Sequence, residues 1–337
     1  MPSSTSSFER HIPAGRWGIT FALAVALAIV ALWRIEVATR ASGQRPSVVD
    51  DPFLWSLSRR QVDSDPRLVV LMGASRMAID YSPTVMREAA PHTRVIQLSI
   101  SDHLPLAVLA DLAADPAFHG IAVVDLIESE MASPLLMTAA HEYIDRSHTL
   151  WRAPGALINR YFASVAQSQL AELALGGRRL IMGLVAKRAL PAPAWVAIDR
   201  DRTSHADYSL SPPGALLSKA GRRLENLAPA PSPAEWLAKL DVELEPLVRA
   251  IEARGGHVVV VRLPISGRLA AAIDERYPRA TYWDAFAART HATTIQARDL
   301  PETAALVCPD EMHLDGKDQP VFTRALAGAL RARKLIG

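Results

Sequence analysis

Two short segments near opposite ends of the sequence carry residue types that together suit nucleophilic catalysis. An apolar run ends in Met72-Gly73-Ala74-Ser75, which places a serine where a strand turns into a helix. The positive end of that helix would stabilise an oxyanion beside the serine. Near the other end, Asp310 and His313 share one short loop. A serine nucleophile needs a base, and the base needs an acceptor that fixes its tautomer.

Each segment alone is a weak signal. A Gly-x-Ser turn is most often a turn with a helix cap, and an Asp-x-x-His tetrapeptide also arises by chance. Their positions strengthen the interpretation, because Ser75 follows the first predicted strand and His313 precedes the last predicted helix. Ligands of doubly wound sheets collect at the carboxyl ends of the strands. Ser75, His313 and Asp310 are therefore the candidate catalytic residues.

The elements that would position these residues alternate between strand and helix. Strands are predicted at 67–72, 93–98, 120–127 and 257–263, with a fifth candidate at 280–286. The run at 67–72 is continuously apolar, which is typical of a strand buried on both faces. Helices are predicted at 84–90, 105–114, 235–254 with a kink at Pro246, and 319–333. This alternation predicts an α/β fold with a doubly wound, flavodoxin-like parallel sheet.

The region 140–231 interrupts the alternation. Helices are predicted at 157–174 and 180–188, and Pro and Ser then accumulate through 190–233. We interpret the region as a helical insertion on one edge of the sheet. Its aromatic residues suit stacking on sugars or docking to a membrane partner, although their spacing favours the core of a helical subdomain. These residues are Trp151, Tyr161 and Phe162.

A membrane anchor is predicted near the amino end. Residues 18–32 are uncharged and apolar, and Trp17 and Trp33 bracket them. A helix over 17–33 would be roughly 25 Å long, at the short end for a bilayer crossing. No clean small-x-small cleavage site follows, which favours an uncleaved anchor over a cleavable signal peptide. Arginines on both sides leave the orientation undecided: Arg10, Arg16, Arg34, Arg40 and Arg45.

The chain is therefore divided into four parts. A tail at 1–16 precedes a transmembrane anchor at 17–34, a polar tether at 35–65 and an α/β domain at 66–337. The anchor accounts for much of the mean hydropathy of +0.10.

Composition excludes several other classes of function. The 37 basic and 35 acidic residues are dispersed, which leaves no basic stripe for nucleic acid. The single cysteine excludes an intramolecular disulfide and a multi-cysteine metal site. His141, His148 and His205 lack metal-ligand spacing, so neither a metal nor a cofactor is predicted.

Four stretches together resemble the SGNH (GDSL-like) hydrolase superfamily. They more closely resemble its membrane-anchored bacterial branch associated with O-acylation of cell-envelope polysaccharides, which includes alginate O-acetylation proteins and the teichoic-acid D-alanyl transfer protein. The stretches are 71–82 (LMGASRMAIDYS), 95–104 (VIQLSISDHL), 259–266 (VVVRLPIS) and 310–314 (DEMHL). The resemblance covers about 66–333 and leaves 140–231 unmatched. It implies an SGNH-type sheet with Ser75 as nucleophile, His313 as base and Asp310 as its orienter.

Two departures from the family pattern concern the oxyanion hole. The second block of the family usually supplies a glycine amide, whereas Asp102 stands after Ser99-Ile100-Ser101 here. A carboxylate near an oxyanion is unfavourable unless it is turned away. The family's third-block asparagine is also absent. The candidate oxyanion donors are the amides of Ser75 and Asp102, with Ser99, Ser101 and Ser129 as further donors.

Two arginines are candidates for substrate binding. Arg262 ends the fourth predicted strand, where it suits either an anionic glycan or a carboxylate partner. Arg76 follows Ser75, where a position on the helix surface is the simpler interpretation. Asp80 suits turn chemistry, and Cys308 suits a buried, inert position.

The resemblance implies a serine acyltransferase that O-acylates a cell-envelope or secreted polysaccharide, with acetyl as the leading acyl group. It implies an acyl donor delivered by a multipass membrane O-acyltransferase or as a small activated ester. It also implies a bacterial inner-membrane protein with a cytoplasmic tail, lipid around 17–33 and a periplasmic catalytic domain. Two alternatives stay open: an esterase that uses water as acceptor, and an inactive, anchored scaffold of a polysaccharide-modification complex.

Overall fold

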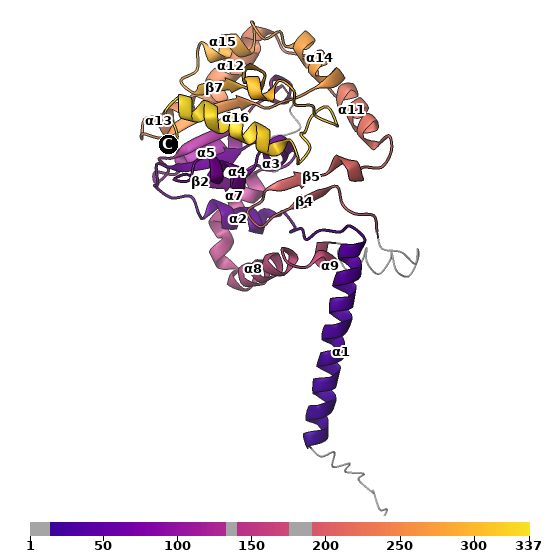
Figure 1. The fold of residues 1–337 in the computed structure, drawn as a ribbon. Helices are drawn as coiled ribbons and strands as arrows, with labels where there is room; N and C mark the ends of the chain where they lie inside the picture. The colour runs from indigo at the N-terminus through magenta and orange to yellow at the C-terminus, as the bar shows by residue number, and fades with distance from the viewer. Residues whose placement is uncertain (1–13, 133–139, 175–190) are drawn as a thin grey trace, which may run out of the picture.

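The architecture is a parallel sheet with helices on both faces, preceded by one long amino-terminal helix (Figure 1). The computed structural model describes residues 14–132, 140–174 and 191–337.

The sheet has five strands in the order β2-β1-β3-β6-β7, and every neighbouring pair is parallel. The strands are β1 (Leu68–Met72), β2 (Arg94–Gln97), β3 (Ile121–Asp125), β6 (His257–Arg262) and β7 (Thr293–Gln296). Counted along the chain, this is the order 2-1-3-4-5. The predicted α/β class with a parallel sheet is confirmed, and the strand order is consistent with a flavodoxin-like fold.

The two faces of the sheet are buried in separate hydrophobic cores, which explains the continuous apolar runs. Val70, Met72 and Val124 lie in one core, whereas Leu71 and Val123 lie in the other. Alternate residues of each strand therefore point to opposite cores.

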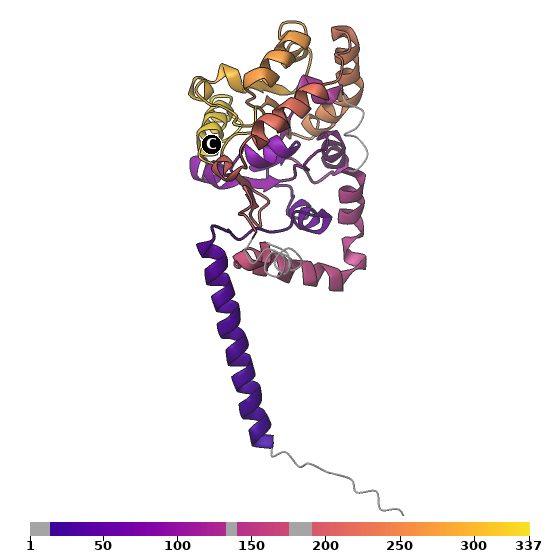
Figure 2. The same ribbon diagram turned by 90° about the vertical axis from the view of Figure 1, so that its right-hand side faces the viewer.

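Helices cover both faces (Figures 1 and 2). One core includes residues of α2 (Pro52–Arg59), α5 (Leu106–Ala114), α12 (Pro233–Glu243), α13 (Glu245–Glu252), α14 (Gly267–Arg276) and α15 (Trp283–Ala287). The other core includes residues of α3 (Ser75–Ile79), α4 (Pro83–Ala89) and α16 (Gln319–Ala332). A short α6 (Glu128–Met131) follows β3.

Two predicted elements differ from the structure. The fifth strand predicted at 280–286 is wrong: these residues lead into α15, where Trp283 and Phe286 are buried three residues apart on one helix face. The fifth strand is β7 instead. The predicted helix at 235–254 is two helices, because the chain breaks at Leu244 and Pro246 starts α13 anew.

The amino-terminal helix α1 (Ala14–Ala41) is longer than the predicted anchor. The part from Trp17 to Ala41 is long and apolar enough to cross a membrane. An ion pair one turn apart, between Glu36 and Arg40, extends the helix beyond the apolar run, and Gly43 with φ of +87° follows its end.

Residues 42–65 are packed against the body, so the predicted tether at 35–65 is wrong. Trp55 of α2 is fully buried and donates a hydrogen bond from Nε1 to the Leu98 carbonyl at 3.0 Å. Arg59 forms ion pairs with Asp111 and Asp115 near α5. The polar composition of this segment reflects buried ion pairs as well as solvent contact.

The insertion 140–231 packs on the rest of the body. Its elements are α7 (Ala140–Thr149), α8 (Pro154–Gln167), α9 (Ala171–Ala174), the hairpin β4 (Val196–Ile198) and β5 (Ser204–Ala206), and α11 (Ala215–Glu225). The helix predicted at 180–188 lies outside the described residues. Buried Arg202 of the hairpin bonds both carboxylate oxygens of Asp50 and the carbonyls of Gln97 and Ser99.

The aromatic residues of the insertion do not form a core. Trp151 is 67% exposed and Phe162 is 65% exposed, so the favoured interpretation of a buried helical subdomain is wrong. Phe162 lies on an outward face of α8, and Trp151 lies in the short turn before that helix.

Replacing Trp55 tests whether residues 42–65 belong to the folded body. We expect Trp55→Ala to lower the free energy of unfolding by about 3–5 kcal/mol, because it removes a large buried side chain and leaves the Leu98 carbonyl without its donor. Urea unfolding of the full chain in detergent measures this. The matched control Trp151→Ala removes an exposed tryptophan and should change stability little. Equal effects would contradict the packing described here.

Candidate active site

Ser75 lies where β1 passes into α3. This position is next to the point between β1 and β3 at which the order of the strands in the sheet reverses. The turn is tight and requires glycine at position 73: a Cβ atom there would lie only 2.8 Å from the Cβ atoms of Asp125 and Met77. Ala74 is extended, and Ser75 begins the helix as a half-buried residue. The local sequence thus leaves the serine hydroxyl accessible at the carboxyl edge of the sheet.

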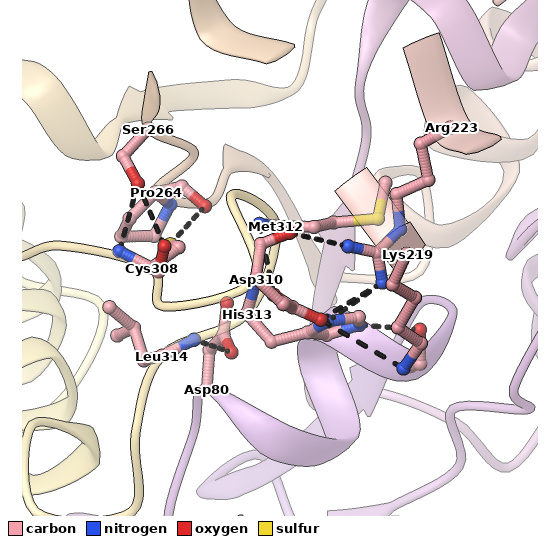
Figure 3. Close-up of polar contacts among 11 residues, drawn as sticks. Asp80, Lys219, Arg223, Pro264, Ser266, Cys308, Asp310, Met312, His313 and Leu314 are labelled. Carbon is pink, nitrogen blue, oxygen red and sulfur yellow. Dashed lines mark hydrogen bonds and ion pairs between the residues drawn. The ribbon is translucent and has the colours of Figure 1, made fainter. Parts of the chain in front are cut away.

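The loop that carries Asp310 and His313 is held from within. Oδ1 of Asp310 accepts hydrogen bonds from the amides of Met312 at 3.1 Å and His313 at 2.8 Å. Glu311, between Asp310 and Met312, adopts a left-handed φ of +66°, which closes the turn. These contacts aim the imidazole and the carboxylate toward each other (Figure 3).

The same loop is also fixed from outside. The Ser266 hydroxyl donates to the Cys308 carbonyl and accepts from the Cys308 amide, which joins the loop to the segment after β6. Asp80 accepts a hydrogen bond from the Leu314 amide at 2.8 Å (Figure 3). Cys308 is buried and donates from its thiol to the Pro264 carbonyl.

The structure brings Ser75, His313 and Asp310 together in one hydrogen-bonded chain. Ser75 Oγ lies 2.8 Å from His313 Nε2, and His313 Nδ1 lies 2.9 Å from Asp310 Oδ2. The tautomer that satisfies both contacts carries its proton on Nδ1, which donates to Asp310. Nε2 then accepts from the serine hydroxyl, and this is the arrangement required for general-base activation.

Asp310 remains ionised despite its burial. Burial favours the neutral acid, but the hydrogen bond and charge of His313 and the charge of Arg223 outweigh it. The pKa of Asp310 is therefore well below its ordinary value. The carboxylate can stabilise an imidazolium when the serine proton moves to His313.

The surroundings of His313 lower its pKa, which favours the neutral imidazole. Burial lowers its pKa from the ordinary value, and the charges of Arg223 and Lys219 act in the same direction. The hydrogen bond and charge of Asp310 oppose this shift without cancelling it. A neutral imidazole is the form that accepts a proton from serine.

Arg223 and Lys219 are site residues that sequence reasoning missed. Both lie one turn apart on α11, and both approach Asp310 (Figure 3). Arg223 donates to Oδ2 of Asp310 at 3.0 Å and to its carbonyl at 2.7 Å, while Lys219 lies 3.9 Å from Oδ2. No motif connects α11 with a loop 87 residues later, so no signal in a single sequence could have identified them.

Apart from Ser75, the oxyanion candidates lie in the loop after β2 and in the short helix α6 after β3. The segment after β2 is joined to β1 by a hydrogen bond from the Ile100 amide to the Gly73 carbonyl at 2.9 Å. Ser101 and Asp102 follow as exposed residues, and Asp102 has a left-handed φ of +62°, a conformation that glycine adopts without strain. The Ser99 hydroxyl is buried and has no hydrogen-bond partner among the described residues. Ser129 is buried in α6, after β3.

The two arginines predicted to bind substrate are occupied by carboxylates. Arg76 is fully buried and pairs with Asp125 at 3.0 Å and Glu130 at 3.1 Å. Arg262 is buried and pairs with Glu128 at 2.9 Å. A buried, paired guanidinium is not available to a glycan, so neither arginine is placed to bind substrate. Of the two interpretations of Arg262, the structure shows the carboxylate partner. The helix-surface position expected for Arg76 is wrong, because its side chain is fully buried.

Comparisons with known proteins add little to this geometry. No protein-family model matches the chain, and no curated protein matches it. Among solved structures, the crystal structure of TesA is a weak neighbour, with 12% sequence identity and a TM-score of 0.36 over 79% of this chain and 98% of that chain. Neither the fold nor the activity follows from a similarity at this level, so the chemistry of the site rests on its own contacts.

The pH dependence of the site depends on Arg223. We expect kcat/KM to fall at acid pH with a midpoint below about 6.5, because the lowered pKa of His313 keeps the base neutral there. In Arg223→Gln a nearby cation is lost, the pKa of His313 rises, and this midpoint should move to higher pH. Hydrolysis of an activated acetyl ester across a pH series measures both.

The matched control is Arg222→Gln, which removes the neighbouring exposed guanidinium on α11. It should leave the acid midpoint in place. An unchanged midpoint in Arg223→Gln would contradict the electrostatic role assigned to Arg223.

Asp80 makes stability depend on pH. Burial raises its pKa well above the ordinary value, so the folded chain keeps this proton where the unfolded chain, with a pKa of about 3.9, releases it. As pH rises from about 4, wild-type stability should fall relative to Asp80→Asn by about 1.4 kcal/mol per pH unit, until the folded pKa is reached. Urea unfolding of both chains over a pH series tests this, and a pH-independent difference would refute it.

Proposed function

We propose that this chain is a serine acyltransferase of the SGNH type, anchored in a membrane by α1. The observation that carries the proposal is the hydrogen-bonded chain Ser75–His313–Asp310 at the carboxyl edge of the sheet. The distance of 2.8 Å between serine and imidazole also weighs against the inactive scaffold, for which no base need contact the serine.

The proposed reaction has two halves with one ester intermediate. In the first half, His313 Nε2 takes the proton of Ser75 as Oγ attacks the acyl carbonyl, and the same proton is then given to the departing alcohol. In the second half, His313 takes a proton from the acceptor hydroxyl, which attacks the ester carbonyl, and returns it to Ser75. The Ser75 amide is one donor to the oxyanion in both halves, with Asp102, Ser101, Ser99 and Ser129 as candidates for the second.

The proposed acceptor is a hydroxyl of a cell-envelope or secreted polysaccharide, and the proposed acyl group is acetyl. This part rests on the sequence resemblance and on α1, which keeps the site beside a membrane. A multipass membrane O-acyltransferase would present the acyl group, or a small activated ester would carry it. The corresponding location is the bacterial inner membrane, with the body on the periplasmic side.

Ser75→Ala tests the nucleophile. We expect the rate of acyl transfer from an activated acetyl ester to fall by at least about 1,000-fold, because the ester intermediate can no longer form. Mass spectrometry of the wild-type chain mixed with the ester should find the acetyl adduct on Ser75. Ser218→Ala, at an exposed serine of α11, is the control and should keep full activity.

Two outcomes separate the alternatives. Unchanged activity in Ser75→Ala would refute the proposal. If oligosaccharide hydroxyls fail to compete with water for the acetyl group, the chain is an esterase and the transferase part is wrong.

A further inference from the structure

Helix α8 presents an apolar stripe to solvent. Ile158 and Phe162 are 57% and 65% exposed and lie one turn apart, and Trp151 precedes the helix with 67% exposure. Tyr161 packs edge-on against Phe162. Soluble surfaces rarely gather large apolar side chains in this way unless something covers them.

The opposite side of α8 is fixed to the body, so the stripe cannot turn inward. Arg160 forms an ion pair with Asp51, and the Gln167 side chain accepts a hydrogen bond from the Val49 amide at 3.1 Å. Ser164 on this side is buried. The outward direction of Phe162 is therefore a property of the folded chain.

The turn after α8 is bound to the end of α1. The Glu36 carboxylate accepts hydrogen bonds from the amides of Ala171 and Glu172 at the start of α9, each at 3.0 Å. Arg40 donates to the Gln169 carbonyl at 2.6 Å. Figures 1 and 2 both show α8 lying crosswise to α1, at the end of the body nearest to it.

These contacts set the height of α8 relative to a bilayer. The apolar run of α1 ends at Trp33, and Glu36 lies three residues later, or about 4.5 Å along the helix axis. The headgroup layer on each side of the hydrocarbon core is roughly 5–8 Å thick. The level of Glu36, where α9 is attached, therefore falls within the headgroup layer.

We infer that α8 lies in the headgroup layer of the phospholipid bilayer that α1 spans, with Ile158 and Phe162 reaching the ends of the acyl chains. Arg152 lies over the Trp151 ring at 5.2 Å, and Arg200 lies over the Tyr161 ring at 4.8 Å. Aromatic rings beside cations suit this layer, where the rings meet the apolar boundary and the guanidinium groups meet phosphates. The inference rests on the proposed anchor and is independent of the acyl chemistry.

Helix α8 would then attach the body to the membrane surface at a second place, without crossing the bilayer. With α1 as the sole attachment, the anchor and the body could tilt together in the bilayer. With α8 in the headgroup layer as well, the carboxyl edge of the sheet keeps one orientation toward the membrane surface.

Fluorescence quenching in vesicles tests this inference. A thiol-reactive NBD label is placed on the full chain at Phe162→Cys, at Val242→Cys as the matched exposed control on α12, and at Leu27→Cys within α1; buried Cys308 stays in place. Each chain is reconstituted in phosphatidylcholine–phosphatidylglycerol vesicles with and without doxyl-labelled lipid. We expect emission from the Phe162 and Leu27 positions to fall at least about twofold more than emission from the Val242 position.

Each outcome supports or overturns the inference. If the Phe162 position is quenched no more than the Val242 position, α8 does not lie in the bilayer. Quenching at Leu27 alone would then leave the anchor intact and mean that this face awaits a protein partner. Absence of quenching at Leu27 as well would overturn the anchor together with the inference.

Discussion

The buried carboxylate of Asp310 is the charge on which the arrangement of the site depends. One oxygen accepts two amides of its own loop, and the other meets His313, Arg223 and Lys219. Burying an unpaired carboxylate would cost several kcal/mol, so these partners are required for the loop to fold as it does. The contacts that make the charge tolerable are also those that orient the imidazole. Stability and alignment of the site therefore come from the same set of hydrogen bonds.

Charge pairing extends along the whole carboxyl edge of the sheet. Arg76 and Arg262 lie near the carboxyl ends of β1 and β6, and each is paired with a carboxylate from the end of β3 or from the helix after it, Asp125 for Arg76 and Glu128 for Arg262. Asp125 contacts both the tight turn at Gly73 and the guanidinium of Arg76. Burial raises the pKa of Asp125 while the charge of Arg76 opposes this. The base of the nucleophile turn is thus a closed polar layer, and the half-buried hydroxyl of Ser75 sits above it as the accessible group.

Sequence reasoning predicted the elements whose signals are local. The runs of β1, β3 and β6 are apolar because both faces of the sheet are covered, and this pattern is visible in any single strand. The candidate triad could also be proposed from the sequence, because Ser75 and the loop 310–314 lie at the boundaries of predicted strands and helices. The predictions that were missed or wrong concern residues whose contacts lie far away in the sequence. Arg223 contacts Asp310, which lies 87 residues further along the chain. Trp55 donates to the carbonyl of Leu98, just after β2, and the sequence of 35–65 contains no sign of this contact.

The contact between Ser75 and His313 joins residues 238 positions apart. A ribosome therefore delivers the serine, the anchor and most of the sheet well before the imidazole that contacts the hydroxyl. Until the last segment of the chain has folded onto the edge of the sheet, Ser75 has only the reactivity of an ordinary alcohol. A nascent chain that ends before this loop therefore lacks the base on which the proposed reaction depends.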